Sequence, residues 1–275
     1  MSRINDSSQT LKARNAMSQT RQKMEKTSGQ LASGKRIRNA GDDAAGLSIA
    51  TNMRSEVLTK RQATRNANDS ISIMHVMEGG IRSINNLIIR VRELAVQSAS
   101  DTVSNQERAY LHEEANELID EISRISKVNQ HNSQSLMQGA NKKLEIQVGD
   151  DNNSSSKLEF DLKDMAHTAY ALGIYDVSLD TKHHANISMY KLDSALRETG
   201  KSLAKIGSFQ SQVQHAINGL ETSTLNVDDA RSRIEDADVA KSSSENIKAK
   251  IKLQNQLAVH STSQDRIAAY LKLLD

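Results

Sequence analysis

The sequence has 275 residues, of which 25% are charged and 37% hydrophobic, and a formal net charge of +2. It contains no cysteine, which excludes disulfides, thiolate metal ligands and cysteine nucleophiles. Aromatic residues make up only 3% of the chain and proline is absent. Because a wide globular core uses more aromatic side chains and proline is the strongest helix breaker, this composition predicts long uninterrupted helices rather than a globular α/β enzyme.

The basic residues of the first 40 positions are spread along the segment and have no aromatic stacking residues among them. We therefore predict no nucleic-acid partner. No run approaches the roughly 18 apolar residues of a membrane span, so we also predict no membrane insertion. The first residues lack the apolar core of a signal peptide. Alone, this feature predicts a cytoplasmic protein, unless export uses a route without a cleaved signal.

The first 40 residues form a thinly amphipathic segment. Its apolar positions follow steps of six or seven residues: Ile4, Leu11, Met17, Met24 and Leu31. Such spacing predicts a helix with one narrow apolar stripe, which needs a partner helix in order to fold.

A much stronger pattern runs from about Asp42 to Ala99. Its apolar residues alternate steps of three and four: Met74, Met77, Ile81, Ile84, Ile88, Val91 and Ala95. This heptad spacing predicts a helix that packs along another helix. After a turn at 98–105, a second helix shows the same spacing at Leu111, Ala115, Leu118, Ile122 and Ile125.

The period then changes to two. Apolar residues alternate in KLEIQV (143–148) and KLEFDL (157–162), and a turn-rich run separates them. This predicts a β-hairpin at about 143–163 whose apolar face lies against the helices.

Two more helices are predicted after the hairpin. One begins near Ile187, with Thr199 and Gln210 as polar interruptions of its heptads. The other covers about 234–274, with a polar window at 260–266. Its main apolar positions are Ile247, Ile251, Leu257, Ile267, Leu271 and Leu274. The simplest arrangement pairs the N-terminal helix with the C-terminal helix, and the remaining apolar stripes imply assembly with other copies.

No stretch carries convincing chemistry. The run GDDAAGLS (41–48) has the glycine and serine spacing of a phosphate-binding loop, but Leu47 replaces the lysine and two aspartates would repel phosphate. Asp42 and Asp43 are better interpreted as the start of a helix, where carboxylates complement the dipole. At His112, half of a zinc-protease motif lacks its second histidine, since residue 116 is Asn. We predict no catalytic residues, no cofactor and no metal.

Several long segments resemble bacterial flagellin. They are LASGKRIRNAGDDAAGLSIA (31–50), NANDSISIMHVMEGGIRSINNLIIRVRELAVQSAS (66–100), ALGIYDVSL (171–179) and SRIEDADVA (232–240). The resemblance implies a mainly α fold, a long antiparallel coiled-coil-like helical rod with one β-hairpin. It also implies terminal inner-core helices at 1–41 and 235–275, paired and disordered before assembly, and a rod domain at 42–234. The short path from hairpin to third helix resembles a flagellin without outer variable domains.

The resemblance further implies a non-enzymatic subunit that polymerises into the flagellar filament for swimming. Such subunits are exported unfolded, without a cleaved signal peptide, and are extracellular. The implied partners are other copies of the chain, an export chaperone at the C-terminal helix, and filament cap and hook-junction proteins. A flagellin-sensing Toll-like receptor is a further implied partner, and Arg90, Leu94 and Glu114 match its recognition pattern. Ordinary helix packing by Leu94, and an ion pair between subunits by Arg90 and Glu114, are the alternative interpretations.

The stretch after residue 41 is predicted to be a joint in the polymer. Asp42 and Asp43 start the rod helix, and the small residues Ala45 and Gly46 allow a neighbouring helix or subunit to approach closely. Two alternatives to a filament subunit are a hook–filament junction protein, which shares the terminal helices, and an intracellular coiled-coil scaffold, which the heptads alone would permit.

Overall fold

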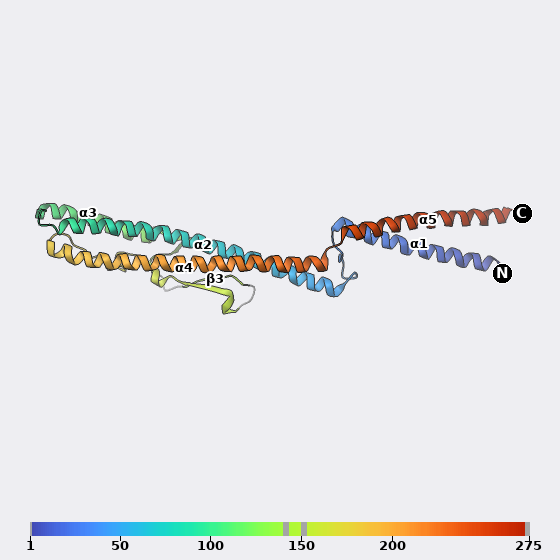
Figure 1. Cartoon of the computed structure of the whole chain (residues 1–275), viewed down its shortest axis with the longest axis horizontal. Helices are drawn as coiled ribbons and strands as arrows, with labels where there is room; N and C mark the ends of the chain where they lie inside the picture. The colour runs from blue at the N-terminus through green and yellow to red at the C-terminus, as the bar shows by residue number, and fades with distance from the viewer. Residues whose placement is uncertain (1, 140–142, 150–152, 273–275) are drawn as a thin grey trace. The chain divides into compact units, whose positions relative to one another are not determined.

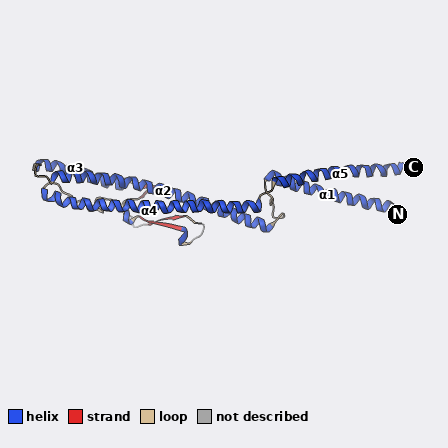
Figure 2. Ribbon diagram, viewed as in Figure 1, coloured by secondary structure: helices blue, strands red, loops and turns tan. Residues whose placement is uncertain are grey.

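The computed structural model describes residues 2–139, 143–149 and 153–272; the side chains of residues 2–7, 9, 154 and 265–272 are not described. The described residues contain five α-helices and two short antiparallel hairpins. Helices make up most of the ribbon in Figure 2. This confirms the predicted mainly α fold with one sizeable β-hairpin. The chain divides into two compact units, residues 1–57 with 225–275 and residues 58–224.

The helices are α1 (Ser2–Ser33), α2 (Ala44–Ser98), α3 (Asn105–Val128), α4 (Lys182–Glu235) and α5 (Val239–Lys272). Four of them begin in the same way, with a short polar side chain that accepts a hydrogen bond from the main-chain N–H three residues later. The capping residues are Asp43 for α2, Ser104 for α3, Thr181 for α4 and Asp238 for α5.

These caps correct two predicted boundaries. Helix α4 begins at Lys182, not near Ile187, and the last helix begins at Val239, not near 234. The spacing of apolar residues does not locate these two helix starts, because the capping residues Thr181 and Asp238 set them. The polar window at 260–266 does not interrupt α5, which continues to Lys272.

The core of unit 58–224 is the predicted heptad seam. All seven α2 residues from Met74 to Ala95 in that seam have no exposed surface. Helices α2, α3 and α4 lie side by side in Figure 1, joined by the ion pairs Arg90–Glu114 and Arg92–Asp193. The polar interruptions on α4 have partners on α2: the Thr199 hydroxyl donates to Asn85 at 2.8 Å, and the Gln210 amide donates to Glu78 at 3.2 Å.

The predicted hairpin is formed by β3 (Lys143–Gln147) and β4 (Lys157–Asp161). Antiparallel pairing places Leu144 opposite Phe160 and Ile146 opposite Leu158. Phe160 is buried, and its ring lies 4.9 Å from the Phe209 ring of α4. The hairpin therefore packs on the helices by its apolar face, as predicted.

A second, very short hairpin was not predicted. Strands β1 (Gln130–His131) and β2 (Gln134–Ser135) are joined by Asn132 and Ser133, both with positive φ. The remaining elements are two single turns of 3₁₀ helix, η1 (Ser154–Ser156) and η2 (Lys163–Met165).

Candidate assembly surface

Helices α1 and α5 pack against each other in unit 1–57 with 225–275, and they diverge toward the N-terminal end of α1 and the C-terminal end of α5 (Figure 1). The contact is built largely from polar and small side chains. The Asn246 amide donates to the Met24 carbonyl at 3.2 Å and to the Thr27 hydroxyl at 3.0 Å, and Lys23 lies 3.4 Å from Glu245. Among the described side chains of α5, only that of Ala249 is a buried hydrophobic one. A seam this polar specifies register but contributes little hydrophobic stabilisation.

Four of the larger apolar residues in the described part of α5 are exposed in the single chain. Ile247 and Ile251 are 55% and 53% exposed, and Leu257 and Val259 are 49% and 69% exposed. At 100° per residue, Ile247 and Ile251 each lie about 160° around the helix from the buried Ala249. On α1, Leu11 is 61% exposed, whereas Met24 and Leu31 are partly buried.

The predicted seam residues thus divide into two groups. Met24 and Leu31 are partly buried within the chain, whereas Leu11, Ile247, Ile251 and Leu257 are exposed. The side chains of Ile4, Ile267 and Leu271, and the whole of Leu274, lie outside the described residues.

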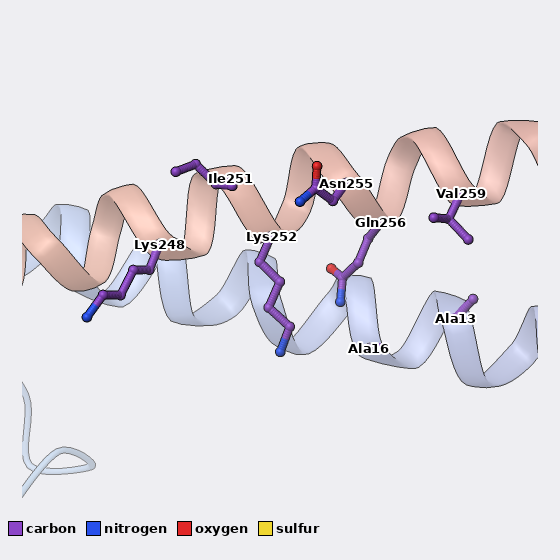
Figure 3. A pocket seen from close by; sticks show the side chains of 8 residues that line it. All are labelled: Ala13, Ala16, Lys248, Ile251, Lys252, Asn255, Gln256 and Val259. Atoms are coloured by element: carbon purple, nitrogen blue, oxygen red, sulfur yellow. The ribbon is translucent and has the colours of Figure 1, made fainter.

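A groove of about 450 Å³ runs along this helix pair. Figure 3 shows Lys252 and Gln256 extending from α5 across α1, with Val259 close to Ala13. The other lining residues are Ala16, Lys248, Ile251 and Asn255. The groove combines apolar walls with lysine ammonium groups, which suits a protein surface better than a small apolar molecule.

The connections at the base of α1 and α5 are tied to each other. The main-chain N–H of Arg36 donates to the Glu235 carbonyl at 2.7 Å, and that of Ala237 donates to the Gly34 carbonyl at 2.8 Å. The Lys35 ammonium pairs with the Glu235 carboxylate, which is 11% exposed. Gly34 has φ +69°, a conformation that favours glycine.

The predicted joint at residues 42–46 lies in this region. Asp43 caps α2 by accepting from the Gly46 N–H at 2.9 Å, in agreement with the prediction for Asp43. Asp42 does not cap the helix: its carboxylate pairs with Lys26 at 2.7 Å and accepts from the N–H groups of Arg38 and Asn39. The hydrogen bond from Lys26, followed by that from Arg38, lowers the pKa of Asp42.

Gly46 is buried, and the chain itself fills the space beside it. A Cβ atom there would lie 2.5 Å from the Asp43 carboxylate and 2.7 Å from Cδ1 of Ile37. The close approach at Gly46 is thus made by the preceding loop of the same chain, which corrects the expectation of a neighbouring helix or subunit. Ala45 is exposed, so the expectation for that residue stays a prediction.

The three residues of the predicted receptor pattern occupy different environments. Arg90 lies 2.9 Å from Glu114 and 3.1 Å from Glu93, all on the surface. Leu94 is only 2% exposed and belongs to the core. The structure therefore brings Arg90 and Glu114 together but does not place Leu94 on a surface that a partner could touch.

The described residues contain no group of three or more His, Asp or Glu side chains placed to hold a metal ion. Within the same part of the chain, no helix combines the length and apolarity needed to cross a bilayer. Long heptad helices, a packed hairpin and an uncovered terminal helix pair define a helical structural protein.

Comparison with known proteins gives the family. The bacterial flagellin N-terminal helical region matches residues 4–142, and the bacterial flagellin C-terminal helical region matches residues 189–274. Flagellin of Halalkalibacterium halodurans is 34% identical over 252 residues, 91% of each chain. The flagellar filament 33 kDa core protein of Treponema phagedenis is 30% identical over 286 residues, 98% of this chain and 99% of that protein. This chain belongs to the bacterial flagellins.

The solved structures agree with this assignment. The crystal structure of Bacillus cereus flagellin is 25% identical, has a TM-score of 0.51, and covers 57% of this chain and 88% of that one. Only 46 residues, 143–188, separate the two matched regions of this chain, and the structure places the β3–β4 hairpin there. It is therefore a short flagellin without an outer variable domain between its halves, and a structural subunit of the flagellar filament.

Proposed function

We propose that this chain polymerises with copies of itself through the α1–α5 pair to build an extracellular flagellar filament for swimming. The supporting observation is the exposure of Ile247 and Ile251 on α5. Exposed isoleucines at helical spacing are costly for an isolated chain and favourable at an interface between copies. The names of the relatives, flagellin and filament core protein, favour a filament subunit over a hook–filament junction protein or an intracellular scaffold.

The same helix pair supports the proposed route to the filament. A polar α1–α5 seam with little buried apolar surface is weak by itself, so we expect both ends to be disordered before assembly and to pass unfolded through the flagellar export channel. Export would proceed without a cleaved signal. The apolar face of α5 would be the site for an export chaperone, and filament cap and hook-junction proteins would contact the polymer ends.

Recognition by a flagellin-sensing Toll-like receptor is a further part of the proposal, in a revised form. Because Leu94 is buried, contact would rely on the exposed Arg90–Glu114 pair, with Leu94 supporting the helix from inside. Exchange of Arg90 and Glu114 for alanine should then weaken receptor activation without changing filament formation.

The filament proposal can be tested with Ile247→Ser combined with Ile251→Ser. If each isoleucine contributes about 1.5–3 kcal/mol when buried between copies, the critical concentration for seeded polymerisation should rise at least about 100-fold. Sedimentation and electron microscopy would measure it. The matched control is Ser244→Ala with Gln254→Ala, two exposed polar positions of α5, which should leave polymerisation unchanged. Normal elongation of the isoleucine variant would contradict the proposed interface, and a small soluble oligomer of the native chain would favour the scaffold.

A further inference from the structure

His167 is a buried histidine in the loop between η2 and α4. It is 1% exposed, and neither Nδ1 nor Nε2 makes a hydrogen bond of standard geometry, although the main chain of Met165 lies near enough to favour a protonated ring. A buried polar side chain without partners is uncommon, because it loses its hydration without compensation. Burial of such a side chain costs even more free energy when the side chain carries a charge.

The residue lies where several segments of unit 58–224 meet. Its main-chain N–H donates to the Met137 carbonyl at 3.0 Å, and the same carbonyl accepts from the Ser126 hydroxyl of α3 at 2.8 Å. Met165 of η2, two residues earlier, has no exposed surface. These contacts join the non-helical layer between α3 and α4 to the helical core.

A second set of contacts ties the same layer to α4. The Ser202 hydroxyl donates to the Asp164 carbonyl at 3.4 Å, and Lys205 lies 2.6 Å from the Asp164 carboxylate. The Lys205 ammonium also lies 5.8 Å from the centre of the buried Phe160 ring in the β3–β4 hairpin. The loop of His167 and the hairpin are therefore held on the same helix.

The charged groups around His167 do not compensate for its burial. Two groups favour a protonated ring: the main chain of Met165 and the carboxylate of Glu198 on α4. The Glu198 carboxylate is itself paired with Lys201 at 2.6 Å. The Asp164 carboxylate is paired with Lys205. From α3 and the 136–139 segment the contacts are the Ser126 hydroxyl and the Met137 carbonyl, neither of which titrates. Burial outweighs these favourable groups and lowers the pKa of His167 below its ordinary 6.5.

We propose that His167 is an acid-sensitive latch that holds the described residues between α3 and α4 (129–139, 143–149 and 153–180) on the helices α2, α3 and α4. A proton can bind the ring readily only after the loop has left the core and the imidazolium has reached water. The folded pKa is lower than the unfolded value, so the stabilisation is complete above about pH 6.5 and is lost as the pH falls below it. In acid the hairpin layer should open first, while the heptad-packed helices stay folded.

The test compares urea unfolding of the full chain at pH 7.5 and pH 5.0 for the native protein and His167→Leu. Between these pH values the folding equilibrium constant of the native chain should fall by up to about 30-fold more than that of the variant, since each pKa unit corresponds to a factor of ten. The matched control is His215→Leu, at an exposed histidine of α4, which should behave like the native chain. Equal losses for the native chain and His167→Leu would overturn the proposal.

If His167→Leu does not fold, two further measurements on the native chain test the proposal. Titration of the His167 ring in the native chain by nuclear magnetic resonance, assigned with His167→Gln, should give a midpoint below 6.5; a midpoint at or above 6.5 contradicts the latch. Protection factors from hydrogen exchange, corrected for the slower intrinsic exchange in acid, should fall between pH 7.5 and pH 5.0 at 157–172 but not at 74–95. A uniform fall would point to global acid unfolding instead.

Discussion

At the scale of single residues, Gly46 shows how a small side chain can be required by the fold rather than by the polymer. Its neighbours are Asp43 and Ile37 of the loop that precedes α2, and Ile37 is buried against it. Ala45, one position earlier, is exposed. A larger side chain at Gly46 should therefore affect the fold of the single chain, whereas one at Ala45 should affect assembly. Substitutions at the two positions can distinguish these effects.

We expect Gly46→Ala to destabilise the single chain by about 1–3 kcal/mol, because the added Cβ forces Asp43 and Ile37 to move. Ala45→Leu should leave the single chain unchanged and impair filaments. Calorimetry of monomers and sedimentation of repolymerised protein measure the two effects. Gly79→Ala is the control: nothing lies within 4 Å of a Cβ at Gly79, so alanine should stabilise α2 by about 0.5–1 kcal/mol. Normal filaments of Ala45→Leu would count against a role for Ala45 in assembly.

Arg108 is a second residue whose role depends on the tertiary structure. It is 6% exposed, and its guanidinium donates to three carbonyls of the turn between α2 and α3: those of Ser98, Ser100 (2.9 Å) and Val103 (3.0 Å). The Ser98 carbonyl belongs to the last turn of α2, where a cation also complements the helix dipole. One side chain therefore closes the end of a 55-residue helix and shapes the turn that follows it.

Replacement of Arg108 by lysine should lower the free energy of unfolding by about 1.5–3 kcal/mol, since an ammonium cannot reach all three carbonyls in the fixed geometry of the guanidinium. Urea denaturation followed by circular dichroism would measure it. Arg124→Lys alters an exposed pair with Glu121 and should leave stability unchanged. If both variants unfolded at the same urea concentration, the proposed stabilisation of the α2–α3 turn by Arg108 would be wrong.

At the scale of elements, the periods of the sequence predicted the helices and the main hairpin, but not all their limits. The three- and four-residue steps from Met74 to Ala95 predicted the fully buried face of α2, and the alternation at 143–148 and 157–162 predicted β3 and β4. Thr181 and Asp238 carried cap signals that would have located the starts of α4 and α5. The β1–β2 turn depends on positive φ at Asn132 and Ser133, which residue type alone does not determine.

The hairpin offers a test at this scale. Phe160→Ala removes the contact with Phe209 and should cost about 3–5 kcal/mol of the stability that holds β3 and β4 on α4. Hydrogen exchange should increase at 143–149 and 157–162 while α2 stays protected. Tyr190→Ala removes an aromatic ring that is 79% exposed and should have little effect. Unchanged exchange in the hairpin of the Phe160 variant would show that other contacts hold it.

At the scale of the whole molecule, the two units differ in how they are stabilised. Unit 58–224 has a continuous core of buried aliphatic and methionine side chains, together with Phe160 and Phe209. The α1–α5 pair relies on Asn246, Thr27 and the Lys23–Glu245 pair, and leaves Ile247 and Ile251 in solvent. Because of this difference, we expect unit 58–224 to fold alone and the α1–α5 pair to need other copies of the chain.

Deletion of residues 1–30 or of residues 245–275 should therefore abolish polymerisation and leave residues 45–225 helical by circular dichroism. Loss of either helix exposes the seam of the other, so both deletions should act equally. Full-length chain treated in parallel is the control for seeding. Filaments formed by either truncated chain would show that pairing of the ends does not drive assembly.

The sequence by itself determined the class of fold and the family, because heptad spacing, two-residue alternation and long family-specific segments are local properties of the chain. It also predicted that the chain ends would pair. Only the tertiary structure decided which side chains those elements cover. It placed Leu94 in the core, left Ile247 and Ile251 exposed, filled the space at Gly46 with Ile37, and buried the His167 ring. These outcomes depend on contacts between residues far apart in the chain, and no local pattern encodes them.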